Sequence, residues 1–329
     1  MVLYGHRLEV FDVRVLKTLL AFALVATCTQ AALAQWPDTT APGNSRFWME
    51  ANGKVLDRPG SQLGVPLITN DITKDVVLTT DQITDLGSTA GAEVRFGSHS
   101  KLMGIDWEFG TQFGGWETDF SANGPDLASP FFAGLDPDIV GVNYKSDFVS
   151  LELNMRKALF PGLTFLTGPR YFRLTEDMNL TSSTTIDTLS GPFTVNTQDM
   201  TNIVNSAIGW QIGMEYNQPV TRDIYLQGFI RTAGLLNGTR LDRSSQTTLV
   251  DQTTTSVSKD TGMFIGTTGG RVYFTIIPNS LRSYAGYEAQ WIDGVAIGPA
   301  QFLGNGTESI DTTNTIFWHA ITFGLRFTY

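Results

Sequence analysis

Apolar and polar residues alternate with a period of two along most of this chain, and this alternation constrains the fold more than any other feature of the sequence. The clearest example is the final segment, TIFWHAITFGLRFTY, in which Phe317, Ile321 and Phe323 share one face. The segments AIGWQIGMEYN and VSLELNMRK repeat the pattern. A period of two is the period of β-strands whose two faces meet different surroundings. The chain is therefore predicted to be all-β.

About ten strands follow from this pattern, and their connections alternate in length. The predicted strands are 45–56, 88–97, 101–115, 143–156, 162–175, 201–217, 222–237, 260–277, 280–297 and 315–329. The short connections cover 97–101, 157–162, 217–223 and 277–280, and the long polar ones cover about 57–87, 116–142, 176–200, 238–259 and 298–314. Short turns at one end and long loops at the other are typical of outer-membrane barrels. A soluble β-sandwich, the alternative, would not sort its loops by length. We predict a transmembrane antiparallel up-and-down β-barrel with both termini in the periplasm.

The N-terminal residues have the form of a cleaved signal peptide. An apolar run from Leu19 to Cys28 follows basic residues, and Ala32-Leu33-Ala34 supplies the small side chains of a cleavage site. We therefore expect residues 1–34 to be removed, 35–44 to form a periplasmic segment, and 45–329 to form the barrel. A lipoprotein anchored through Cys28 is the alternative. Export of this kind predicts a location in the bacterial outer membrane.

The composition excludes several classes of function. Charged residues make up 16% of the chain, against about 25% in soluble domains, as expected if one face of each strand meets lipid. With 22 Lys+Arg against 32 Asp+Glu, the chain has no basic surplus with which to bind nucleic acid. Three His and one Cys are too few for a zinc or iron–sulfur protein, so we expect no cofactor.

Alternation also sorts the charged residues of the strands. In a membrane barrel the polar face lines the lumen. The residues assigned to it are six acids and six arginines: Glu93, Arg95, Asp106, Glu108, Glu152, Arg156, Glu215, Arg231, Arg271, Arg282, Glu288 and Arg326. A balanced set favours structural ion pairs, and a ten-strand barrel is barely wider than one that its own side chains fill. A conducting pore is the alternative. Arg170 and Arg173 have opposite parity, which predicts a bulge or a strand end near Pro169.

Few residues suggest chemistry. His319 falls on the lipid-facing side of the last strand, where we expect an interfacial residue, and no Ser or Asp is placed around it in the sequence, so we expect no enzyme. Asp136 and Asp138 are a weak candidate for a divalent cation, with solvated acidic loops as the preferred interpretation. The alternating apolar residues that end the chain are predicted to serve as an assembly signal: Phe323, Leu325, Phe327 and Tyr329. The expected partners are outer-membrane lipid and the barrel-assembly machinery, and we expect a monomer.

Several segments, taken together, resemble one family. They are RFWMEANGKVLDRPGSQLGVPLIT, LELNMRK followed by GPRYFRLTED, YAGYEAQWIDGVAIGPAQF and FWHAITFGLRFTY. They are similar to segments of the outer-membrane barrels abundant in planctomycete bacteria that are catalogued as the seventh of a series of β-barrel porin families. The resemblance covers most of 45–329, although Ala51-Asn52 departs from it in the first strand. It implies an outer-membrane barrel with a provisional porin label, and it assigns no substrate and no functional residues.

Three functions follow as hypotheses from the sequence. The first is a passive outer-membrane barrel with acidic extracellular loops, acting as a porin or as a surface or structural protein. The second is a surface-binding or adhesion barrel with a closed, ion-paired lumen. An outer-membrane enzyme is the third and least favoured.

Overall fold

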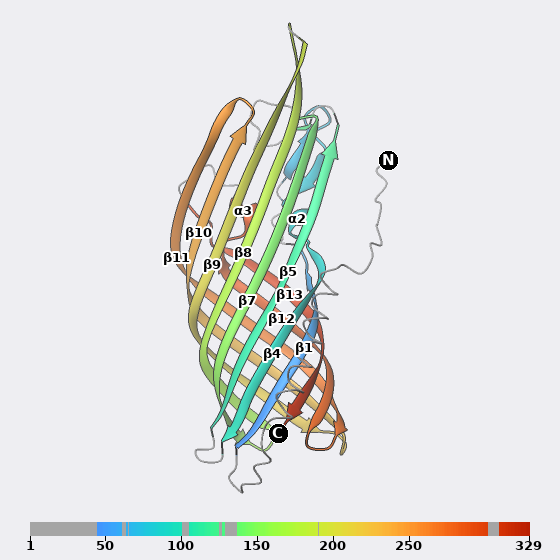
Figure 1. The fold of residues 1–329 in the computed structure, drawn as a ribbon, viewed down its shortest axis with the longest axis vertical. Coiled ribbons are helices and arrows are strands. Elements are labelled where there is room, and N and C mark those ends of the chain that lie inside the picture. The colour runs from blue at the N-terminus through green and yellow to red at the C-terminus, as the bar shows by residue number, and fades with distance from the viewer. Residues whose placement is uncertain are drawn as a thin grey trace, which may run out of the picture.

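The computed structural model describes residues 45–60, 64, 66–100, 105–124, 127–128, 137–189, 191–301 and 309–329, with the main chain alone at 45–46, 99–100 and 250–251. The predicted signal peptide and the segment 35–44 lie outside the described residues. Ten antiparallel strands close into a barrel in the order β1-β13-β12-β11-β10-β9-β8-β7-β5-β4 (Figure 1). Their bounds are β1 Ser45–Arg58, β4 Gly87–Ser100, β5 Asp106–Asn123, β7 Ile139–Phe160, β8 Leu163–Thr188, β9 Gly191–Pro219, β10 Ile224–Thr247, β11 Val250–Ile277, β12 Leu281–Val295 and β13 Asn314–Thr328. The prediction of an antiparallel ten-strand barrel is confirmed.

The strands are longer than predicted at one end of the barrel. The predicted loops 176–200 and 238–259 are wrong, because β8 and β9, and then β10 and β11, continue through them as paired hairpins. These segments are rich in Thr, Ser and Asn, which suggested loops, but Thr also pairs well across strands. We name the two ends by their connections: the turn end, where Ser45 and Tyr329 lie, and the loop end opposite.

The predicted bulge or strand end near Pro169 is wrong. No bulge or strand end occurs there, since β8 keeps one register with β7 from Glu152↔Arg170 to Met155↔Thr167. Arg170 therefore faces the lumen and is buried, whereas Arg173 lies on the outer face. The opposite parity of the two arginines is the ordinary alternation of one continuous strand.

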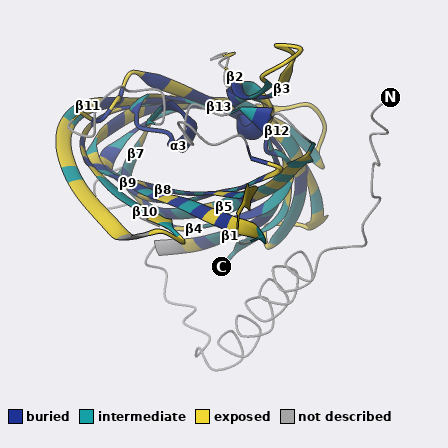
Figure 2. Ribbon diagram, turned by 90° about the horizontal axis from the view of Figure 1, so that it is seen from above, coloured by how far each residue is buried: buried dark blue, intermediate teal, exposed yellow. Residues whose placement is uncertain are grey.

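The barrel wall has an apolar outer face and a polar inner face. Large apolar side chains are exposed on the outside, among them Trp107, Leu153, Ile212, Ile230 and Phe323. Charged and amide side chains are buried inside. In Figure 2, buried and exposed residues alternate along the strands. This arrangement reverses that of a soluble barrel and is the fold of an outer-membrane β-barrel. Among the described residues, no helix is long and apolar enough to cross a membrane.

Six strands extend past the barrel at the loop end. The strands β5, β7, β8, β9, β10 and β11 continue past the last pairs with β4 and β12, from Gly115 on β5 and up to Met263 on β11 (Figure 1). The last residues of β4, up to Gly87, pair with β1 and not with β5. We call this part the extension. Three long connections hold short elements. The connection from β1 to β4 contains β2 Pro66–Asn70, β3 Val76–Thr79 and α2 Thr80–Thr84, that from β5 to β7 contains β6 Leu127–Ala128, and that from β12 to β13 contains α3 Gly298–Gln301.

These short elements pack against the barrel at its loop end. The strands β3, β2 and β6 form a three-stranded sheet, and a capping box between Thr79 and Gln82 begins α2. Leu67, Ile83 and Ile297 from these connections are buried in one apolar core with barrel residues. Seen down the barrel, α3 lies inside the ring of strands (Figure 2). We call these inward-folded elements the plug.

Candidate functional site

Every one of the ten barrel strands contributes a charged side chain to one ion-pair network in the lumen. Its acids are Glu50, Glu93, Glu108, Glu152, Glu215 and Glu288, and its cations are Lys54, Arg95, Arg156, Arg170, Arg231, Arg271 and Arg326. The network occupies the turn-end part of the lumen. Because opposite charges nearly balance within it, no single-sign field lines the interior.

The pairs reach across the lumen as well as between neighbouring strands. Arg231 on β10 places Nη2 2.6 Å from Glu215 Oε1 on the adjacent β9, and Nη1 3.3 Å from Glu152 Oε2 on β7. Arg271 on β11 places Nη1 2.5 Å from Glu50 Oε1 on β1 and Nη2 3.4 Å from Glu93 Oε2 on β4. Strands that share no backbone pairing are thereby joined through the middle of the barrel.

Ten of the twelve predicted lumen residues belong to this network. The other two share its face at the turn end: Asp106 lies opposite Arg156 in register, and the Arg282 guanidinium lies 4.4 Å from the ring centroid of Tyr225. Whether these residues line a pore or serve only as structural ion pairs stays a prediction.

The sequence reasoning missed three members of the network. Glu50 and Lys54 lie on β1, the strand in which the apolar pattern is weakest, and Arg170 was left unassigned beside Pro169. Trp48, Glu50 and Lys54 have the same parity and are all buried. Counting a strict period of two from Trp48 would therefore have assigned Glu50 and Lys54 to the lumen.

Glycines make room for the charged side chains. Gly213 faces Arg231 in register, and a Cβ atom there would lie 2.9 Å from Arg231 Cγ. Gly286 faces Arg271, and a Cβ atom there would lie 2.8 Å from Arg271 Cγ. Since real Cβ atoms essentially never come so close, the bare backbone at these positions gives each arginine stem its space. Some of the 33 glycines of the chain therefore make room for the side chains that fill the lumen.

A layer of aromatic rings lies above the network, toward the loop end. Trp116, Phe148, Phe172 and Trp318 come from β5, β7, β8 and β13, and all four are buried. The ring centroids of Phe148 and Trp318 are 4.8 Å apart, and those of Trp116 and Trp318 are 5.7 Å apart. The rings meet across the lumen, so the barrel carries an apolar layer over its charged one.

A separate buried ion pair anchors the plug above the aromatic layer. Arg58 Nη2 lies 3.0 Å from Glu176 Oε1, and the Arg58 guanidinium also donates to Ser146 Oγ at 2.6 Å. The second oxygen of Glu176 accepts the backbone N–H of Gly298, the first residue of α3, at 2.7 Å. Glu176 had been predicted to lie in a loop; the structure places it on β8, fully buried.

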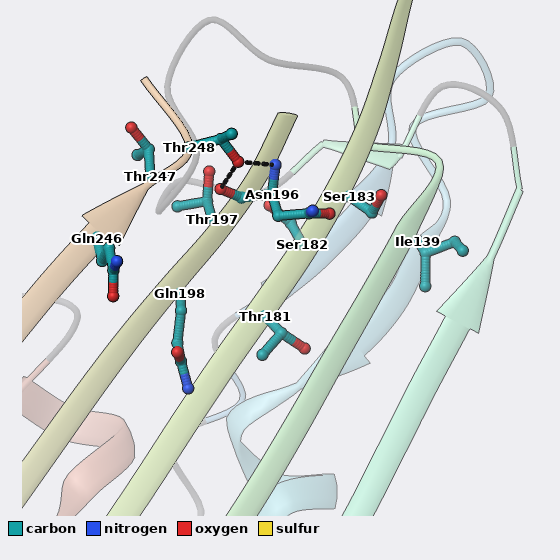
Figure 3. A pocket seen from close by; sticks show the side chains of 10 residues that line it. All are labelled: Ile139, Thr181, Ser182, Ser183, Asn196, Thr197, Gln198, Gln246, Thr247 and Thr248. Atoms are coloured by element: carbon teal, nitrogen blue, oxygen red, sulfur yellow. Dashed lines mark hydrogen bonds between the residues drawn. The ribbon is translucent and has the colours of Figure 1, made fainter. Parts of the chain in front are cut away.

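The extension carries an uncharged concavity of about 660 Å³ on its strands (Figure 3). Its lining is hydroxyl and amide side chains with one aliphatic residue: Ile139, Thr181, Ser182, Ser183, Asn196, Thr197, Gln198, Gln246, Thr247 and Thr248. Thr248 Oγ1 accepts the Asn196 N–H at 3.0 Å and so joins the β10–β11 turn to β9. The lining offers hydrogen bonds and no charge.

His319 lies on the outer wall, as predicted, but it has a partner that the sequence did not reveal. Its Nε2 is 3.0 Å from Asp57 Oδ2 on β1, and Ser88 Oγ donates to the other Asp57 oxygen at 3.1 Å. Both paired side chains are about one-third exposed. The pair joins β1 to β13, the first and last strands of the barrel, and Ser88 contacts the carboxylate of Asp57.

The remaining predicted positions are dispersed. Asp138 accepts the Thr185 N–H at 2.9 Å, Asp136 lies outside the described residues, and no group of three or more potential metal ligands occurs in the described part of the chain. The predicted assembly residues Phe323, Leu325 and Phe327 share the outer face of β13. Tyr329 follows them, half exposed, and its N–H donates to Phe47 O at 2.9 Å.

Comparisons with known proteins assign no family and no activity to the chain. No family model matches the chain and no curated protein matches it, so the resemblance to the porin family is not confirmed. The outer membrane protease OmpT from Escherichia coli is similar at a TM-score of 0.41 and 10% identity, over 88% of this chain and 98% of that one. The translocator domain of the autotransporter NalP from Neisseria meningitidis gives 0.40 and 12%, over 94% and 97%. The toluene transporter TodX of P. putida gives 0.33 and 10%, over 88% and 90%. Likenesses this distant carry no argument about activity.

Proposed function

We propose that this protein is a closed, non-conducting outer-membrane barrel that acts at the cell surface through its extension. The observation that carries the proposal is the filling of the lumen by two successive layers. The ion-pair network joins all ten strands, and the aromatic layer above it is made of four rings from β5, β7, β8 and β13. A hydrated ion would have to displace both layers, and removing the partner of a buried charge is costly.

The proposal includes an orientation. The turn end, with Ser45 and Tyr329, faces the periplasm, and the loop end with its acidic residues faces outward. The predicted N-terminal signal peptide, the predicted assembly residue Tyr329 and the even number of strands support this orientation. The extension then stands beyond the apolar wall, where partners outside the cell reach it.

The pore named by the family resemblance is the competing function. Planar-bilayer recording of the refolded full chain distinguishes the two, because a closed lumen gives no stepwise current at ±100 mV in 1 M KCl. Correct folding is verified by heat-dependent migration on gels. Stepwise, reproducible conductance of the wild-type protein would overturn the proposal.

A matched pair of variants tests whether the absence of current is due to the filled lumen. Arg231→Ser combined with Trp318→Ala removes one member from each layer, and we expect brief openings from this variant. Ile230→Ser combined with Phe317→Ala changes neighbouring residues on the outer wall and is expected to stay silent. Equal currents from both variants would indicate leakage around the barrel and would count against a lumen closed by these layers.

A further inference from the structure

We infer that the free edge of β11 in the extension binds an extended, basic peptide as an added β-strand. The inference rests on the proposed function, since it needs the loop end to face outward. β11 pairs with β10 from Val250 to Phe274, but with β12 only from Phe264 onward. Among the described residues, Gln252 to Met263 therefore have a strand neighbour on one side alone. Figure 1 shows this stretch at the outer margin of the extension.

The edge is opened by the way β12 ends. The β12 pairing shifts register between Asp293 and Val295, and Gly294 between them has a φ of +82°. Only glycine adopts this conformation without strain, and a Cβ atom at Gly294 would also lie 2.2 Å from Gly262 O. The chain then turns inward to α3 instead of continuing beside β11. The fold thus removes the strand that would have covered this edge.

The register shows which main-chain groups are free. The Thr275 N–H donates to Asp223 O on the β10 side at 2.9 Å, and the β10–β11 register is constant from Phe274 to Thr253. Odd-numbered residues of β11 therefore direct their N–H and C=O groups to β10. The free groups directed away belong to Thr254, Ser256, Ser258 and Asp260, because the next such carbonyl, Gly262 O, faces Gly294 of β12. They span seven residues, about 23 Å of strand at ~3.3 Å per residue.

Nothing in the chemistry of this edge blocks a partner strand. Proteins protect free edges with proline, bulges or lysine side chains. The run from Gln252 to Ser258, QTTTSVS, contains no charge, proline or glycine and is rich in β-branched residues. The one lysine nearby is engaged elsewhere, since Lys259 Nζ donates to Ile310 O at 2.8 Å. An edge of this kind favours recognition through main-chain hydrogen bonds.

The charge around the β11 edge favours a basic peptide as the partner. Two exposed acidic side chains lie at the edge on the outer face, Asp260 on β11 and Asp293 on β12. Asp242 on the adjacent β10 is paired with the exposed Arg240, 2.8 Å away, so these two charges balance. The Asp293 carboxylate accepts a hydrogen bond from Thr315 Oγ1 at 2.7 Å. A strand with lysines on alternate residues would place its charges on this face and would be steered toward it.

A second copy of the chain fits less well. Two copies in one membrane share their orientation, so two β11 edges related by a two-fold axis would run parallel. Because barrel strands tilt by about 35–45°, the two edges would also cross at roughly twice that angle and form no ladder. The opposite free edge of the extension, Gly115–Asn123 on β5, runs antiparallel to β11. Association of two copies through the β5 and β11 edges would appear in the test below as self-association of the protein.

The test uses the full chain in phosphatidylcholine nanodiscs and a fluorescent nine-residue peptide of alternating lysine and threonine. Anisotropy gives the dissociation constant in 50 mM and 300 mM salt. Ser256→Pro removes a free-edge N–H and spares the backbone bonds to β10, but it also removes the Ser256 hydroxyl, which is hydrogen-bonded to Asp242 on β10. Ser256→Ala removes the same hydroxyl and keeps the N–H, so the difference between the two variants reports the N–H. We expect at least tenfold weaker binding for the proline variant and less than a twofold change for the alanine variant. Full N-methylation of the peptide, or glutamate in place of lysine, should abolish binding.

The outcomes separate the two proposals. If neither Ser256→Pro nor N-methylation of the peptide changes the dissociation constant, binding reflects surface charge alone and the inference is overturned. So would the absence of binding, or self-association of the wild type that Ser256→Pro removes. None of these outcomes produces current through the barrel. Conductance of the wild type would overturn the proposed function whatever the peptide does.

Discussion

The ring of Phe148 on β7 stacks against that of Trp318 on β13, although three strands separate β7 from β13 around the nearer side of the barrel. Contacts of this kind make the wall and its filling one unit, because strands without mutual hydrogen bonds depend on side chains that meet in the middle. The stability of the barrel should therefore depend on lumen residues as much as on the strand ladder.

Trp318→Ala tests this dependence for the aromatic layer. Removing the buried indole should reduce the free energy of unfolding by about 3–5 kcal/mol, measured by urea titration of the protein in lipid vesicles. Trp318→Phe keeps a ring against Phe148 and removes an indole N–H that has no hydrogen-bond partner, so we expect a clearly smaller loss. Equal losses for the two variants would show that stacking is not the source of the stability.

The Arg58–Glu176 pair should behave as a buried ion pair. Arg58→Met leaves the Glu176 carboxylate buried without its cation and should cost about 3–5 kcal/mol of unfolding free energy. The double variant Arg58→Met/Glu176→Gln leaves no unpaired charge and should recover most of that loss. A double variant no more stable than the single one would mean that the arginine acts through its contacts with Ser146 and the Trp116 ring rather than through charge.

The outer-wall pair Asp57–His319 should matter much less. Both side chains are about one-third exposed, and partly solvated ion pairs contribute about 0.2–1 kcal/mol. His319→Gln should therefore change the unfolding free energy by no more than about 1 kcal/mol under the same titration. A loss as large as that of Arg58→Met would show that this pair controls closure between β1 and β13.

The sequence predicted the wall of this barrel but only part of what fills it. Alternation places a residue on one face or the other, so Glu152 and Arg231 could be assigned to the lumen without knowing their partners. Which residues meet across the lumen depends on barrel closure, and no local pattern encodes that Arg271 contacts Glu50. Glu176 lies in a run of polar residues that resembles a loop, and its burial depends on Arg58 and α3, both far away in the sequence. The Asp57–His319 contact is equally non-local.

The glycines of the wall give a prediction with an internal control. At Gly286 a Cβ atom would lie 2.5 Å from Gly270 O and 2.8 Å from Arg271 Cγ, whereas at Gly228 nothing lies within 4 Å. Gly286→Ala should cost about 1–3 kcal/mol of unfolding free energy through overpacking. Gly228→Ala should be neutral or slightly stabilising, since it lowers the entropy of the unfolded chain. Similar losses at both sites would contradict the space-making role of the lumen glycines.

The last residues of the chain combine a structural and an assembly role. The Tyr329 N–H bonds to Phe47 O, and Phe327 pairs in register with Met49 on β1 and Leu281 on β12. Deleting residues 327–329 removes the pairing that closes β13 against β1 at the turn end, together with the aromatic terminus predicted to signal assembly. We expect much less folded protein in the outer-membrane fraction of an expressing bacterium, measured by heat-dependent migration.

Two variants separate the roles: Tyr329→Ala removes the aromatic ring but keeps the backbone bond, and Thr328→Ala keeps both. If the signal resides in the ring, Tyr329→Ala should reproduce most of the loss and Thr328→Ala none of it. Normal levels of folded barrel after the deletion would remove the assembly role from these residues, because neither the pairing nor the ring would then be needed for insertion.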